Sequence, residues 1–163
     1  MISKNKLPKP IEIVDKLIDN SFPKLERRWI IVTENKIFNL KYSAITSYFL
    51  FFSWIAVHPK VRKYSKASLN ALFAHELAHL DLIANMNLFE KIKFGFIWLF
   101  TKKGKENFER DADILVVKKG YGKERLELGK ESKKTYTKKE LERGRKGYLT
   151  PEQIKSYIKK FKK

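Results

Sequence analysis

The segment His75-Glu76-Leu77-Ala78-His79 is the feature that most constrains how this chain can fold. Residues four positions apart lie on the same face of an α-helix, so both imidazoles can reach one metal ion. Glu76 lies one position round the helix, where it can act on a metal-bound water without binding the metal itself. The chain has only three histidines, and two of them form this pattern. The pattern therefore predicts a helix here and a zinc site on it, with a third ligand supplied from elsewhere.

Length and composition are those of a single soluble domain. The chain has 163 residues, 43% of them hydrophobic, which is enough to bury a core. It contains no cysteine, which excludes disulfides and cysteine-based zinc sites and makes a reducing interior the default compartment. Residues 1–10 do not look like a signal peptide, and the apolar runs at 48–57 and 94–100 are far shorter than the ~20 residues of a membrane span. We therefore expect a soluble, cytoplasmic protein.

The charge is strongly positive. Lysine and arginine number 36 against 18 acidic residues, giving a net charge of +18. Such a charge favours nucleic acid, anionic lipid or acidic protein surfaces as partners, although a lysine-rich thermophile proteome would produce it with no partner. An alternative to an enzyme is thus a non-catalytic, zinc-containing binding module that uses its basic surface, with Tyr136, Tyr148 and Tyr157 as stacking residues. No recognised nucleic-acid-binding signature accompanies them, so nucleic acid is the less favoured partner.

The order of elements predicts an α+β fold. Residues 10–20 carry a helical apolar stripe. Three extended segments, 28–33, 36–43 and one within 48–61, form a three-stranded, mainly antiparallel sheet, and Pro59 marks the last of them as an edge strand or marks its end. A helix beginning near Ser65, with Ser65 or Ser68 as its cap, carries the histidines, and a second spans about 105–119 and is closed by Gly120. An apolar connection, 85–104, joins these two helices. We interpret 94–100 as core between them and keep a peripheral membrane contact as the alternative.

The basic remainder of the chain, 126–163, is interpreted as a helical tail that follows a catalytic domain at 1–125. Capping boxes that start at Thr137 and Thr150 indicate short helices in this tail.

Carboxylates of the second helix are the favoured source of the third ligand, because no histidine follows His79 and the one upstream, His58, is less favoured as a metal ligand. Glu109 and Asp113 are four residues apart and share a helix face, so Glu109 can bind zinc while Asp113 orients one ligand histidine through its other ring nitrogen. Glu106 is the next candidate ligand. His58, beside Pro59, is interpreted as a strand-end or cleft-lining residue. The competing structural interpretation is a solvated acidic helix face and ordinary core histidines.

These motifs resemble those of the gluzincin metallopeptidases. His75-Glu76-Leu77-Ala78-His79, then Glu109-Arg110-Asp111-Ala112-Asp113, then Gly120-Tyr121 are similar to the family of the CAAX prenyl endopeptidase and HtpX, and most similar to its soluble versions, the minigluzincins. Over residues 10–125 the resemblance implies an N-terminal helix, a three-stranded sheet, an active-site helix and a glutamate helix. It implies zinc at His75, His79 and Glu109, catalysis by Glu76 and support from Asp113. It also implies a zymogen-like state in which a terminal segment, here the basic tail, obstructs the cleft.

The predicted activity is zinc-dependent hydrolysis of peptide bonds in a peptide or protein substrate. Glu76 would take a proton from the water and deliver it to the leaving amine. Tyr121, His58 and Arg110 are the candidates for a donor to the oxyanion, and the sequence does not choose among them. The strand ending near His58 would hold an extended substrate by backbone pairing.

Overall fold

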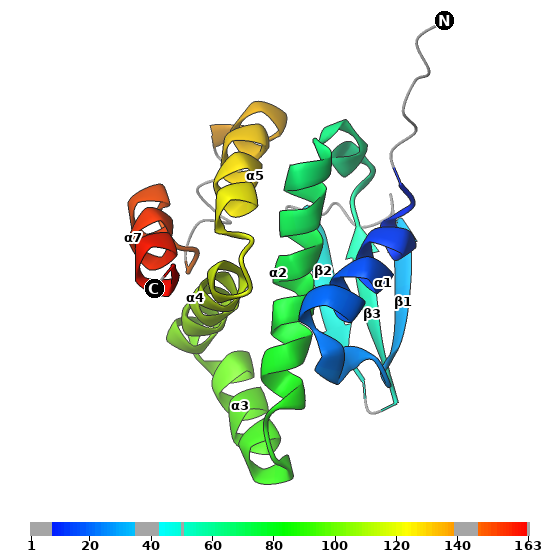
Figure 1. Cartoon of the computed structure of the whole chain (residues 1–163). Coiled ribbons are helices and arrows are strands. Elements are labelled where there is room, and N and C mark those ends of the chain that lie inside the picture. The colour runs from blue at the N-terminus through cyan, green and yellow to red at the C-terminus, as the bar shows by residue number, and fades with distance from the viewer. Residues whose placement is uncertain (1–7, 35–42, 50, 139–146, 163) are drawn as a thin grey trace, which may run out of the picture.

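The computed structural model describes residues 8–34, 43–49, 51–138 and 147–162. The elements follow one another as α1 (Pro10–Ser21), η1 (Pro23–Leu25), β1 (Trp29–Glu34), β2 (Ala44–Tyr48), β3 (Phe52–Val57), η2 (Pro59–Lys63), α2 (Lys66–Ala84), α3 (Leu88–Phe100), α4 (Lys102–Lys118), α5 (Gly122–Thr135) and α7 (Pro151–Phe161). The α+β class is confirmed, with an N-terminal helix, a three-stranded sheet and a helical remainder (Figure 1).

The sheet is mixed and has the order β1-β3-β2. β2 and β3 form an antiparallel hairpin, whereas β1 pairs with β3 in parallel. Glu34 at the end of β1 and Ala44 at the start of β2 both lie opposite Val57, so the chain leaves β1 and enters β2 at the same end of the sheet. The mainly antiparallel arrangement expected from the sequence therefore holds for one of the two strand pairs. The segment 48–61 supplies the central strand, so of the two interpretations of Pro59 the edge strand is wrong, whereas the strand does end just before it, at Val57.

The strand limits differ from those expected. β1 and β3 fall within or beside the predicted segments 28–33 and 48–61. The predicted strand 36–43 lies outside the described residues except for Ser43, and the described second strand is Ala44–Tyr48. The sequence pattern predicts β2 poorly, because Thr46 and Ser47 interrupt its apolar residues.

Helix α2 is the centre of the molecule. The hydroxyl of Ser65 accepts a hydrogen bond from the Ser68 backbone N–H at 3.2 Å, so Ser65 is the cap of the two serines that the sequence offered. Buried residues occur on every side of α2 from Ser68 to Asp81. The sheet and α1 lie on one side of it, and α4 and α5 on the other (Figure 1). Phe73, Leu77 and Leu80 are fully buried, and each stabilises the fold by roughly 1.5–3 kcal/mol.

The connection between the two site-bearing helices is itself largely helical. α3 occupies Leu88–Phe100, capped by Asn87, and α4 begins at Lys102. The prediction that 94–100 fills the core is wrong, because Phe96 and Phe100 are 62% and 77% exposed. Among the described residues, no helix combines the length and the apolar character needed to cross a membrane.

Helices α5 and α7 pack on the rest of the chain, α5 against α2 and α7 on the outside of α4 and α5. α5 lies against α2 and contributes Leu128 to the main core, so the boundary expected between 125 and 126 falls inside this helix. α7 packs on α4 and α5, where Leu149 and Ile154 form a smaller cluster with Val117. The capping box at Thr150 is present, and the one at Thr137 extends into residues outside the described part of the chain.

Candidate metal centre

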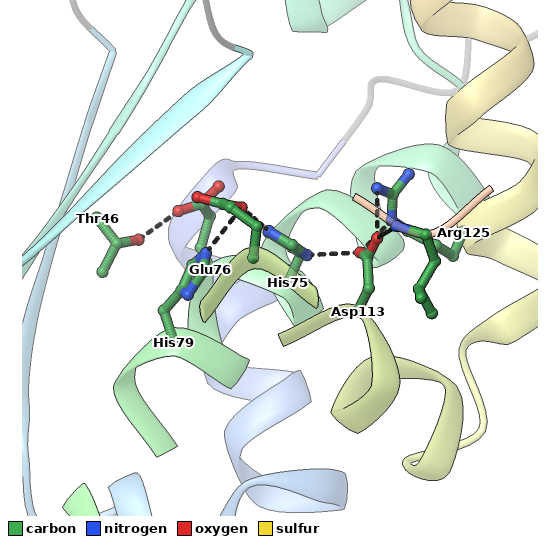
Figure 2. A network of polar contacts seen from close by, with 8 residues as sticks. Thr46, His75, Glu76, His79, Asp113 and Arg125 are labelled. Carbon is green, nitrogen blue, oxygen red and sulfur yellow. Dashed lines mark hydrogen bonds and ion pairs between the residues drawn. The ribbon is translucent and has the colours of Figure 1, made fainter. Parts of the chain in front are cut away.

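The two histidines of the motif point the same way from α2 (Figure 2). His75 and His79 are 5% and 8% exposed, and their ring centroids are 4.7 Å apart. Successive turns of one helix bring them together, so this half of the site is set by local geometry alone. The Nδ1 atom of His79 is buried and makes no hydrogen bond within the described part of the chain.

Glu109 comes to the histidines from α4. Its Oε2 lies 3.1 Å from His75 Nε2 and 3.4 Å from His79 Nε2. One ligand atom from each of these three residues lies within 4.8 Å of the others. Ligand atoms around a tetrahedral zinc ion are roughly 3.4 Å apart when the metal–ligand bonds are about 2.1 Å. The donor set and its spacing therefore fit a zinc ion, and the alternative ligand Glu106 is not part of the cluster.

Asp113, one turn beyond Glu109, lies behind the histidines. Its Oδ1 is 2.9 Å from Nδ1 of His75, which leaves Nε2 of that ring to face Glu109. Arg125 from α5 donates to the same carboxylate through Nε at 2.7 Å and through its terminal nitrogen at 3.1 Å. The Leu149 backbone N–H donates to Asp113 Oδ2 at 2.9 Å. Asp113 thus connects a ligand histidine, α5 and the C-terminal tail (Figure 2).

The charges in the cluster shift one another. Burial favours the neutral form of His75, but contacts with Asp113 and Glu109 outweigh it and raise the pKa of the metal-free imidazole to about 10. Burial likewise opposes ionisation of Asp113, yet Arg125 and His75 hold its pKa well below the usual range. For Glu109, too, the two histidines outweigh burial and lower the pKa. In all three groups an oppositely charged neighbour outweighs burial, so the charged form of each is favoured in the metal-free site.

Glu76 is buried at 6% exposure on the side of α2 that faces β2. Its Oε2 accepts a hydrogen bond from the Thr46 hydroxyl at 2.5 Å (Figure 2). This hydrogen bond holds the carboxylate beside the histidines without making it a member of the metal-ligand cluster. Thr46 was not identified from the sequence, because only the packing of β2 against α2 places it there.

The segment 147–149 lies over the site. A Cβ on Gly147, whose φ is +114°, would come within 2.8 Å of Glu106 Cα and 3.1 Å of Glu109 Cβ, so this backbone touches the glutamate helix directly. The ring of Tyr148 is 5.4 Å from that of His75 and 5.3 Å from the Arg125 guanidinium. Burial and nearby carboxylates raise the pKa of the Tyr148 phenol well above its usual value. Tyr148 is thus a neutral hydroxyl group close to the candidate metal ligands.

A cavity of about 600 Å³ opens beside the cluster. Its walls come from Ser43 and Ala44 at the start of β2, from α2, from α5 and from the tail. They include His75, Glu76, Arg125 and Tyr148. Tail residues Leu149 and Ile154 make part of the wall apolar. Among the described residues that follow α5, Tyr136 and residues 148–151 therefore share a cavity wall with Glu76.

The three candidates for an oxyanion donor are not among the residues that line this cavity. The Tyr121 hydroxyl is 2.8 Å from the Ser21 hydroxyl, at the end of α1. His58 caps η2, and its Nδ1 accepts a hydrogen bond from the Lys60 backbone at 3.0 Å. Arg110 is exposed on α4. The cavity is lined instead by Arg125 and Tyr148, which sequence reasoning did not place at the site.

The three tyrosines considered for stacking on nucleic acid are either buried or packed against another ring of the protein. Tyr136 is 8% exposed and belongs to the main core. Tyr148 faces His75, and Tyr157 stacks on Phe161 with ring centroids 5.8 Å apart. None of them presents a free aromatic face of the kind that binds a base.

Comparison with known proteins yields no match: no family model, curated protein or solved structure corresponds to this chain. The metal centre therefore rests on the geometry of the described side chains.

Proposed function

We propose that this chain is a zinc-dependent metallopeptidase of the gluzincin type, held in a self-inhibited state by its C-terminal tail. The single observation that carries the proposal is the convergence of His75, His79 and Glu109 beside a buried glutamate, Glu76, that is outside the ligand set. Two imidazoles and one carboxylate form a donor set typical of catalytic zinc, which keeps a coordination position for water or substrate. A structural zinc site would be closed by a fourth protein ligand.

The roles of the residues follow from their positions. Bound zinc supplies a Lewis acid that makes water more acidic and polarises a carbonyl group. Glu76 accepts the proton of the attacking water and delivers it to the leaving amine. The Thr46 hydroxyl holds Glu76 in place, while Asp113 fixes the tautomer of His75 by facing its Nδ1.

The substrate is a peptide in extended conformation that pairs with β2. β2 is an edge strand of the sheet, lies beside α2 and carries Thr46, which contacts Glu76. The strand ending near His58, expected to hold the substrate, is the central strand β3 and has no free edge. Backbone pairing along β2 gives affinity with little sequence preference.

Self-inhibition is supported by three contacts of the tail. Gly147 lies on the glutamate helix, Tyr148 faces His75, and the Leu149 N–H binds Asp113. Together they hold the tail against the cluster and in the wall of the cavity beside it. The neutral Tyr148 hydroxyl also suits a donor to the oxyanion, so the effect of removing it distinguishes a blocking residue from a catalytic one.

The first experiment measures zinc content and cleavage of an unstructured protein such as casein. Wild type and Glu76→Gln should each bind one zinc per chain, and Glu109→Ala should lose most of it. Tyr148→Ala should cleave faster than wild type, and the double variant with Glu76→Gln should not cleave. A matched control is Tyr157→Ala, which removes a tail tyrosine outside the cavity wall.

Three results would contradict these assignments. Full cleavage by the Glu76→Gln variant in the activated background would exclude the general-base mechanism. Unchanged zinc content in Glu109→Ala would exclude this ligand set. Lower cleavage in Tyr148→Ala would make Tyr148 part of the catalytic apparatus and not a plug. Deleting the tail from residue 126 is a poor substitute, because it would remove most of α5, which packs in the main core.

A further inference from the structure

Helix α3 presents an apolar face that nothing in the described part of the chain covers. None of its residues is buried. At 100° per residue, six of its large apolar side chains fall on one arc of about 120°. Each is more than half exposed: Leu88 75%, Phe89 83%, Ile92 54%, Phe96 62%, Leu99 63% and Phe100 77%. A monomeric soluble protein rarely exposes so continuous an apolar surface without using it.

The opposite side of α3 fixes the helix to α4. Phe94 packs on Phe108, with ring centroids 4.6 Å apart. Ile97 lies directly against Gly104, where an added Cβ would approach its side chain to 2.5 Å. Lys105 Nζ lies 5.0 Å from the centre of the Trp98 ring. The inner side of α3 is therefore occupied, and the apolar arc points away from the protein.

Other aromatic residues are exposed at the same end of the molecule. Phe51 and Phe49, at the turn between β2 and β3, are 81% and 44% exposed, and Trp29 at the start of β1 is 73% exposed. Lys91 of α3 lies 5.6 Å from the ring of Tyr48 at the end of β2, so the two groups adjoin. Figure 1 shows α3 and the adjoining ends of β2 and β3 at the lower end of the fold.

Lysines border this end. Residues 88–105 contain Lys91, Lys93, Lys102, Lys103 and Lys105 against the single acid Glu90. The Glu90 carboxylate is engaged in capping α3, where it accepts a hydrogen bond from the Asn87 N–H at 2.7 Å. A second copy of this chain would bring like charges together, whereas an anionic surface would complement them.

We propose that this end of the protein, defined by α3, the β2–β3 turn and Trp29, docks on the surface of an anionic lipid bilayer. α3, about 20 Å long at 1.5 Å per residue, lies in the plane of the interface, with its six apolar side chains among the acyl chains and its lysines at the headgroups. Exposed tryptophan and phenylalanine suit this interfacial depth. The inference does not depend on the proposed peptidase activity.

The test is flotation of the full chain with vesicles of phosphatidylcholine that contain about one-third phosphatidylserine, or none. Wild type should bind the anionic vesicles and bind pure phosphatidylcholine far more weakly. Phe89→Ser combined with Phe96→Ser keeps the net charge and should weaken partitioning by about tenfold per phenylalanine. The matched control, Ile11→Ser combined with Phe161→Ser, removes two exposed apolar residues from other helices and should bind like wild type.

A second pair of variants tests the charge. Lys93→Gln with Lys103→Gln should bind anionic vesicles more weakly than Lys159→Gln with Lys160→Gln, which has the same net charge but changes α7. If the Phe89→Ser, Phe96→Ser double variant binds vesicles like wild type, the proposal is overturned, because the overall positive charge would then explain the binding. Absence of wild-type binding at low salt would also overturn it. A third contrary result would be a wild-type dimer in sedimentation experiments that dissociates in the Phe89→Ser, Phe96→Ser double variant.

Discussion

Replacing Asp113 by asparagine should disturb both the stability of the protein and its affinity for metal. Asp113 is fully buried and receives hydrogen bonds from Arg125 at 2.7 and 3.1 Å and from the Leu149 N–H at 2.9 Å. Asparagine has nearly the same shape but no charge. The substitution therefore leaves the guanidinium of Arg125, whose side chain is only 12% exposed, without its counter-ion.

The cost can be estimated from these contacts. Removing one partner of a buried ion pair destabilises a protein by about 3–5 kcal/mol, and the retained amide oxygen favours the lower end of that range. A loss of about 3 kcal/mol lowers the melting temperature of a domain of this size by roughly 6–12 °C. Loss of the carboxylate behind His75 should also weaken metal binding by about 10–100-fold.

The assay is denaturant unfolding of the metal-free protein, followed by zinc affinity in competition with a chelator. The control is Asp111→Asn, which removes a carboxylate from the exposed side of the same helix and should change stability by no more than about 0.5 kcal/mol. If Asp113→Asn unfolds at the same denaturant concentration as Asp111→Asn and binds zinc equally well, the role assigned to this carboxylate is wrong.

Three further outcomes are expected. The folded state lowers the pKa of Asp113, so its carboxylate stabilises the fold above the ordinary pKa of 3.8 and loses this effect as the pH falls below that value. The stability of metal-free wild type should therefore fall more steeply with acidification than that of Asp113→Asn. In the activated Tyr148→Ala background, Thr46→Val should lower turnover while zinc content stays at one per chain, because it removes only the hydrogen bond to Glu76; equal turnover would remove Thr46 from the mechanism. Gly147→Ala should force the tail off α4 and raise both cleavage and proteolysis of the tail, whereas Gly120→Ala, also at positive φ but with open space around it, should change only stability.

Local geometry explains why part of the site could be predicted from the sequence. His75 and His79 are placed by one turn of a single helix, and Glu109 and Asp113 by one turn of another. Ser65 as a cap and Gly120, with φ of +97°, as a helix end are also local signals. These features need no knowledge of which segments pack together, so periodicity and spacing are sufficient to find them.

The remaining site residues depend on packing between distant segments. Thr46, Arg125 and Tyr148 come from β2, α5 and the tail, and each reaches the site only because its element lies against α2 or α4. None has a spacing relative to the histidines that a helix or strand would impose. The exposure of α3 was missed for a related reason: an apolar run has the same composition whether it fills a core or faces outward.

The balance of charge in the site also argues for a cation. Arg125 pairs with Asp113, whereas the Glu109 carboxylate faces the two histidines, which balance its charge only when a ring carries a proton. A divalent cation between Glu109 and the histidines would take the place of that proton as the partner of the carboxylate. Zinc should therefore stabilise the wild type, by about 4 kcal/mol at free zinc near 1,000 times its dissociation constant, and should stabilise Glu109→Gln far less. A melting temperature that zinc leaves unchanged would mean that the cluster is satisfied without a metal.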